Sequence, residues 1–103
     1  LINQERDTTA IFAVTDSMAI GAIKAAKRYG LNVPDDISIM GFDDTYLAQI
    51  IEPPLTTIRI PKMLLGRESV NRLIALLNDP DLAPTQLALQ VKLIERNSVT
   101  YRT

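Results

Sequence analysis

The chain has 103 residues, of which 47% are apolar, and its formal net charge is −1. This length and composition indicate at most one globular domain and argue against disorder. The 11 lysines and arginines are scattered among 12 acidic residues, so the sequence offers no concentrated positive face for a phosphate backbone. Cysteine and histidine are absent, which excludes the usual zinc sites and histidine-dependent nucleophiles. The sequence also shows no nucleophile–base pair that supports hydrolytic chemistry, and we expect no enzymatic activity, no catalytic residue, no metal site and no cofactor.

The sequence also lacks a segment that could cross a bilayer, because no apolar run approaches the roughly 20 residues that this requires. Residues 1–6 show no initiator methionine and no signal peptide, and they could be the end of a helix. We expect a cytoplasmic protein with no membrane partner, of which this chain is a fragment.

A strand, a helix and a second strand are predicted in the first half of the chain. The apolar run at 10–14 is typical of a strand covered on both faces. One of the polar residues at 15–17 can cap the helix that the spacing predicts over 17–29. Gly30 is placed to end that helix in the left-handed conformation. With a further strand at 37–42, this makes a right-handed βαβ unit.

The second half of the chain predicts shorter elements and one long helix. Residues 46–51 form a short helix or an extended piece, and 55–60 a strand. The helix over Lys62–Asn78 has apolar residues at three-four spacing. The alternation at 87–93 predicts a final strand, and 97–103 a polar tail.

Polar residues follow both strands of the predicted βαβ unit. Thr15 and Asp16 follow the first strand, and Asp43 and Asp44 follow the second. Because ligands of parallel α/β sheets bind beyond the carboxyl ends of the strands, one small-molecule site is predicted there. A structural interpretation stands beside it: both acidic residues after the second strand could be turn residues, and Asp16 a cap or a support of the fold.

Five segments of the chain resemble the C-terminal part of LacI/GalR-type transcriptional regulators, in order and at family spacing. The segments are residues 10–22, 30–44, 53–58, 65–66 and 95–98. The resemblance implies an α/β fold with a parallel sheet, a three-layer lobe similar to type I periplasmic binding proteins. Residues 1–60 and 87–103 then belong to the C-terminal lobe, and 61–79 to a helix of the N-terminal lobe. Residues 58–61 and 81–86 become crossovers between lobes.

The resemblance also implies residue roles. Asp43 stands where the family has its effector-binding aspartate, and its carboxylate can accept hydrogen bonds from ligand hydroxyls. Thr15 replaces an asparagine that faces the effector in most members, and Ile60 replaces a polar residue, often glutamine. Phe42 can stack on a ligand ring, although it could equally fill the core, as could Ile60. The dimer surface of the family maps to Ile20, Ile23, Lys24, Leu47, Ile50 and Ile51, although the five apolar residues of this set could also belong to the core.

These roles imply the effector-binding and dimerisation part of a bacterial repressor that responds to a small sugar or nucleoside-like ligand. Such a protein forms a homodimer and binds operator DNA through a helix-turn-helix domain that this chain lacks. One alternative is a periplasmic-type sugar-binding transport protein, which needs a secretory leader. Another is a receiver-like signalling domain in which Asp43 and Asp44 hold magnesium; that interpretation needs a further acid and a lysine at matching strand ends.

Overall fold

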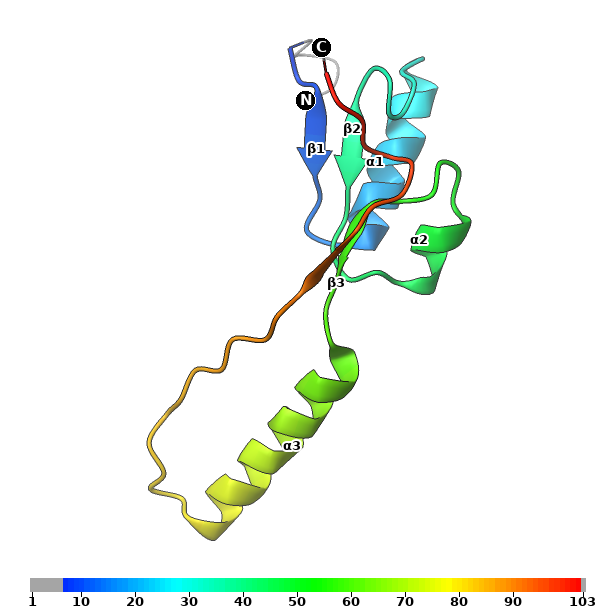
Figure 1. Ribbon diagram of the computed structural model, residues 1–103. Helices are drawn as coiled ribbons and strands as arrows, with labels where there is room; N and C mark the ends of the chain where they lie inside the picture. Colours follow the sequence, from blue (N-terminus) through cyan, green and yellow to red (C-terminus); the bar gives the residue numbers. More distant parts are fainter. Residues whose placement is uncertain (1–6, 103) are drawn as a thin grey trace. The chain divides into compact units, whose positions relative to one another are not determined.

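The computed structural model describes residues 7–102 of the chain, which form alternating strands and helices (Figure 1). The elements in chain order are β1 (Ala10–Phe12), α1 (Asp16–Arg28), β2 (Ser38–Met40), α2 (Tyr46–Ile50), β3 (Thr57–Arg59), α3 (Lys62–Asn78) and β4 (Lys92–Ile94). The helix end considered for residues 1–6 and the last residue of the predicted tail lie outside the described range.

The chain folds as two compact units. Unit 1 holds the described residues up to Arg59 and again from Lys92 onward, and unit 2 spans Ile60–Val91. The first boundary falls inside the predicted crossover at 58–61, whereas the second lies beyond the predicted crossover at 81–86. The assignment of the two units to different lobes stays a prediction.

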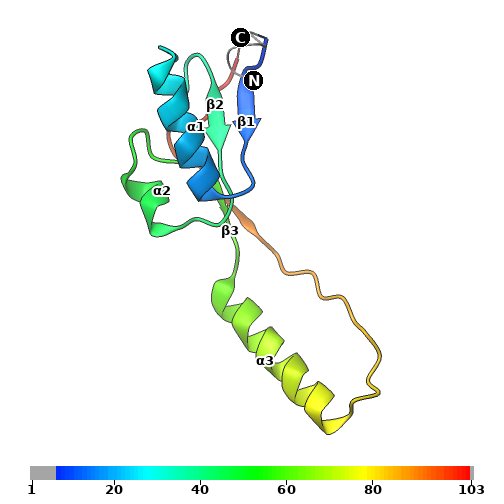
Figure 2. The ribbon, with the colours of Figure 1, turned by 180° about the vertical axis from the view of Figure 1, so that it is seen from behind.

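Unit 1 is built on short paired strands. Strand β1 pairs with β2 in parallel, with Phe12 opposite Met40, and the two lie side by side in both views (Figures 1 and 2). On the other side of β2, the Ile39 amide donates to the Ser98 carbonyl at 2.8 Å, and Met40 forms a parallel bridge with Thr56. Strand β3 pairs with β4 in the antiparallel direction. The parallel βαβ unit predicted from the sequence is therefore confirmed.

Helix α1 begins and ends for local reasons that the sequence indicates. Thr15 is extended, and its hydroxyl oxygen accepts the Met18 amide at 3.2 Å, which makes it the N-cap. The residue after the C-cap is Gly30 with φ of 77°, a left-handed conformation that glycine adopts without steric cost. The predicted helix at 17–29 is thus correct to within one residue at each end.

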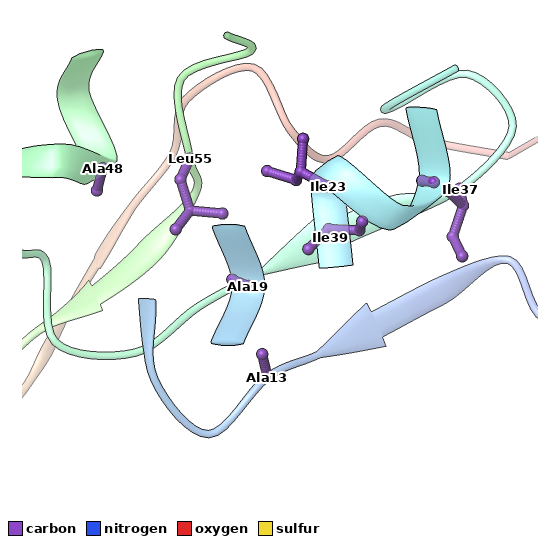
Figure 3. Packing of buried hydrophobic residues seen from close by; sticks show 8 residues of the cluster. Ala13, Ala19, Ile23, Ile37, Ile39, Ala48 and Leu55 are labelled. Carbon is purple, nitrogen blue, oxygen red and sulfur yellow. The ribbon is translucent and has the colours of Figure 1, made fainter. Parts of the chain in front are cut away.

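The core of unit 1 lies between α1, α2 and β2 (Figure 3). Ala19 and Ile23 of α1 face Ile39 of β2, and all three side chains are fully buried. The burial of Ile23 corrects its prediction as a dimer contact, because a side chain inside the core cannot touch a second chain. Helical spacing identifies the faces of α1 but does not tell which face turns inward.

The predicted final strand at 87–93 is wrong over most of its length. Only Lys92–Ile94 forms a strand, and the residues before it have no ladder partner within residues 7–102. Alternating hydrophobicity describes which side chains share a face, but a strand also requires a neighbour for its backbone groups. The strand predicted at 55–60 is likewise reduced to Thr57–Arg59.

Helix α3 of unit 2 has the predicted bounds, and none of its residues is buried. Its apolar side chains remain open to solvent, for example Met63 at 84% and Leu77 at 73% exposure. Monomeric proteins rarely expose a continuous apolar stripe of this kind.

A polypeptide of these 103 residues is therefore expected to self-associate, with α3 exchanged between chains as one route. Light scattering at rising concentration should show a mass above that of the monomer. Replacing Val70 and Leu73, both on the stripe, by glutamate should shift the population toward the monomer. A well-folded monomer of the unaltered chain at high concentration would refute this expectation.

Candidate functional site

The ends of β1 and β2 meet at one edge of unit 1. Beyond the strands, the Ala13 amide donates to the Met40 carbonyl at 2.8 Å and the Asp16 amide to the Phe42 carbonyl at 3.1 Å. These bonds bring residues 15–17 and 42–45 together, and we call these two segments the rim. The rim is the edge at which the sequence predicts a ligand site.

The second segment of the rim makes a turn with unusual backbone angles. Asp43 has φ of 120° and Asp44 has φ of 54°, a region that residues with a side chain rarely adopt. The turn is held by hydrogen bonds from the Asp43 amide to the Ile58 carbonyl at 2.8 Å and from the Asp44 amide to the Thr57 hydroxyl at 3.3 Å. Strained conformations of this kind cost of order 1–3 kcal/mol and are concentrated at functional sites.

Asp16 supports the turn through hydrogen bonds of its carboxylate. Its side chain is fully buried and accepts the Thr57 hydroxyl at 2.6 Å, the Thr45 amide at 2.6 Å and the Thr45 hydroxyl at 3.2 Å. Gly41 leaves room for it, because a Cβ at position 41 would run into the Asp16 carboxylate and lie 3.0 Å from Leu55. Asp16 is therefore a support of the fold, as the structural interpretation of the sequence held.

Asp44 is paired with two arginines. Its carboxylate accepts Arg59 Nε at 2.7 Å and Arg96 Nη2 at 2.8 Å, and its side chain is only 5% exposed. Arg96 is itself fixed, because its Nη1 donates to the Leu55 carbonyl at 2.9 Å. Burial raises the pKa of Asp44, but the hydrogen bonds and charges of Arg59 and Arg96 outweigh it and bring the pKa below its ordinary value.

This lowered pKa predicts how Asp44 contributes to stability at different pH. A carboxyl with a lower pKa in the folded state stabilises the fold above its unfolded pKa of about 3.9, and the contribution is lost as pH falls through the folded pKa. The difference in unfolding free energy between the unaltered protein and Asp44→Asn should be constant from about pH 5 to 7 and shrink below about pH 4. Urea denaturation across this range measures it. The exposed Asp35 provides the control Asp35→Asn, and an Asp44→Asn difference that is constant down to pH 3 would contradict the expectation.

The other predicted effector residues occupy different positions. Thr15 is exposed on the rim, where its hydroxyl caps α1. Phe42 is half-buried and lines an open hollow of about 330 Å³ together with Phe12, Ala13 and Val14. Ile60 is half-buried and is the first residue of unit 2, and its role as a pocket wall stays a prediction.

Sequence reasoning missed the residues that hold the turn, namely Thr45, Thr57, Arg59 and Arg96. Two adjacent aspartates in one turn carry a charge that a nearby cation can balance, and Arg96 lies within a segment that matched the family. Nothing in the sequence, however, indicates that Arg59 and Arg96 approach the same carboxylate.

The predicted dimer residues other than Ile23 lie on or near the surface. Leu47 and Ile50 of α2 are 53% and 59% exposed, and Lys24 of α1 is exposed. Ile20 and Ile51 are half-buried. The four apolar residues of this set leave apolar surface on α1, on α2 and at the C-cap of α2 that a second chain could cover.

Within residues 7–102, no group of three or more acidic, cysteine or histidine side chains is arranged to hold a metal ion. The helices in the same range are too short or too polar to cross a membrane.

The comparison with protein families assigns the class. Residues 2–99 match the model of the periplasmic binding protein-like domain, and the chain belongs to this family. The match covers all of unit 2, nearly all of unit 1 and the whole rim.

Relatives within this family are LacI-type regulators, as the resemblance implied. The chain is 38% identical over 99 residues to the ribose operon repressor of Haemophilus influenzae, covering 96% of this chain and 30% of that protein. It is 40% identical over 98 residues to the transcriptional repressor CytR of Escherichia coli, covering 95% and 29%. The chain thus spans about a third of the length of the curated relatives that it matches.

Solved structures give the same result. The lac repressor dimer bound to operator and an anti-inducer matches with a TM-score of 0.80 and 41% identity, over 90% of this chain and 32% of that one. A LacI family regulator from Enterococcus faecalis with bound ribose matches with a TM-score of 0.83 and 34% identity, over 95% and 36%. The fold and the resemblance predicted from the sequence are therefore confirmed.

Proposed function

We propose that this chain is the effector-binding and dimerisation part of a DNA-binding transcriptional repressor that responds to a small sugar or nucleoside-like ligand. The observation that supports the proposal is the rim, where the strained turn at Asp43 and Asp44 follows β2 and residues 15–17 follow β1 at the same edge. Relatives that are named as repressors, and a similar regulator that holds ribose, support the ligand class.

Each residue of the proposed site has a chemical role. The Asp43 carboxylate accepts hydrogen bonds from ligand hydroxyls, and two such bonds can form at once. The Thr15 hydroxyl accepts the Met18 amide through one of its lone pairs, and this bond does not use its O–H, which can donate to the ligand. Phe42 offers an apolar ring face beside the hollow. Ile60 gives the ligand an apolar wall in the proposed two-lobed protein.

The proposed protein acts as a homodimer in the cytoplasm and has no enzymatic activity. Ile20, Lys24, Leu47, Ile50 and Ile51 form the proposed dimer surface. The basic residues of this chain do not form a positive face. In the proposed protein, operator DNA is therefore bound by a domain outside this chain. The effector acts by binding one arrangement of the two lobes better than the other, because a ligand shifts an equilibrium only through differential affinity.

A thermal-shift screen of the full-length protein tests the proposal. The probes are D-ribose, other pentoses, hexoses, nucleosides and nucleobases. At least one of them should raise the melting temperature in a concentration-dependent way. Glycerol at equal concentration controls for non-specific stabilisation by polyols. Absence of a saturable shift from every probe class would contradict the proposed ligand class.

A further inference from the structure

The Asp44 carboxylate joins the turn to two distant parts of the chain. Arg59 is the last residue of β3, after which the chain enters unit 2. Arg96 follows β4, with which the chain returns to unit 1. The two arginines reach separate oxygens of the carboxylate, Arg59 at Oδ2 and Arg96 at Oδ1. One side chain thus joins two segments of unit 1, the end of β3 and the residues after β4.

We call Asp44 together with Arg59 and Arg96 the clamp. The clamp matters because the backbone of the turn to which Asp44 belongs is strained. Asp44 has a left-handed φ of 54° and follows directly on Asp43 at 120°. The turn is strained, so it persists only while surrounding contacts over-determine it. Hydrogen bonds from the Asp43 and Asp44 amides to β3 fix the backbone of the turn. The two charge-assisted hydrogen bonds from the arginines fix the Asp44 side chain.

The Arg96 contact is the more rigid of the two. The Arg96 side chain is 14% exposed, whereas that of Arg59 is 51% exposed. Arg96 also donates to the Leu55 carbonyl, and its amide donates to the Thr56 hydroxyl, both at 2.9 Å. Arg96 therefore anchors the clamp in the core of unit 1, whereas Arg59 binds Asp44 from the surface.

We propose that Asp44 is a positioning residue for the effector site: by binding Arg59 and Arg96 it holds the strained turn and sets the direction of the adjacent Asp43. This inference rests on the proposed function, because it assumes that Asp43 faces the ligand. It goes beyond that function by giving the second aspartate a separate role, without contact to the ligand.

Residue-resolved amide hydrogen exchange of the full-length protein, without any ligand, tests the positioning role. In Asp44→Asn, exchange of the amides at 43–45 should rise about tenfold or more, while the Ile39 amide in the core keeps its protection. The matched control is Asp36→Asn, because the Asp36 carboxylate accepts the Asn32 amide at 2.6 Å away from the rim. The control should leave exchange at 43–45 unchanged.

A second variant decides the test if Asp44→Asn raises exchange throughout the fold. Arg59→Gln removes the ion pair between Arg59 and Asp44 and keeps the pair between Arg96 and Asp44, so it should raise exchange at 43–45 only several-fold. Arg59→Lys should restore part of the protection. Unchanged exchange at 43–45 in both Asp44→Asn and Arg59→Gln would overturn the proposal.

The effector readout separates this inference from the proposed function. For a probe that binds the unaltered protein, Asp44→Asn should weaken affinity about tenfold, which corresponds to about 1.4 kcal/mol. Normal affinity in Asp44→Asn would overturn the effector part of the inference. If no probe binds the unaltered protein, the proposed function fails, whereas the exchange experiment still decides whether Asp44 holds the turn.

Discussion

Replacement of Asp43 by alanine is expected to weaken effector binding at least about 100-fold. Two hydrogen bonds from ligand hydroxyls to a carboxylate are worth about 1.5–3 kcal/mol each, and every 1.4 kcal/mol is a factor of ten in affinity. Isothermal titration of the full-length protein with the probe selected by thermal shift measures the loss. Asp35→Ala is the matched control, because Asp35 is exposed and lies away from the rim. An unchanged affinity in Asp43→Ala would remove Asp43 from the site.

The backbone of Asp43 offers a second comparison that does not depend on the ligand. Alanine and glycine both remove the carboxylate, but only glycine adopts a φ of 120° without strain. Asp43→Gly should therefore be more stable than Asp43→Ala by about 1–2 kcal/mol, while both lose effector affinity. Such a result would show that the backbone at position 43 is strained when the residue carries a side chain. Equal stability of the two variants in urea denaturation would show that the turn relaxes.

Replacement of Asp16 by alanine is expected to cause the largest loss of stability, about 3 kcal/mol or more. The buried carboxylate accepts hydrogen bonds from the Thr57 hydroxyl and from the amide and the hydroxyl of Thr45. Its removal leaves these three donors without their partner. Chemical denaturation followed by circular dichroism measures the loss.

Two companion variants distinguish the cause of this loss. Thr57→Val removes one donor and keeps the shape of the side chain, so it should cost less than Asp16→Ala. Gly41→Ala keeps every donor but forces a Cβ against the Asp16 carboxylate, and it should also destabilise the fold. If Asp16→Ala costs less than about 1 kcal/mol, the buried network does not support the turn.

Local signals in the sequence predict much of the fold. Helix α1 follows from three-four spacing, the cap at Thr15 and the glycine after its end. Helix α3 follows from its apolar periodicity with bounds that agree at both ends. Each of these features depends on residues near one another in the chain, which is why a single sequence is enough.

Features that depend on distant residues are not predicted. The strand expected at 87–93 fails for most of its length, because its partner is not determined by its own residues. Ile23 and Ile20 lie three residues apart on α1, yet Ile23 is in the core and Ile20 is half-buried. Only the packing of α1 on β2 and α2 separates these two positions.

The candidate site shows the same division. The rim follows from the sequence, because parallel strands bring their carboxyl ends to one edge and polar residues follow both strands. The different surroundings of Asp16, Asp43 and Asp44 do not follow from it. Asp16 is buried among hydroxyls, and Asp44 is paired with arginines from segments far along the chain. Asp16 and Asp44 thus have different surroundings that only the fold reveals, and the role of Asp43 stays a proposal.

The direct test of the central claim is a crystal structure of the full-length protein with the effector selected by the screen. The account predicts an Asp43 carboxylate oxygen about 2.5–3.0 Å from a ligand hydroxyl oxygen, with Asp44 still bound to Arg59 and Arg96 and out of reach of the ligand. A ligand bound elsewhere, with Asp43 facing solvent, would contradict the account.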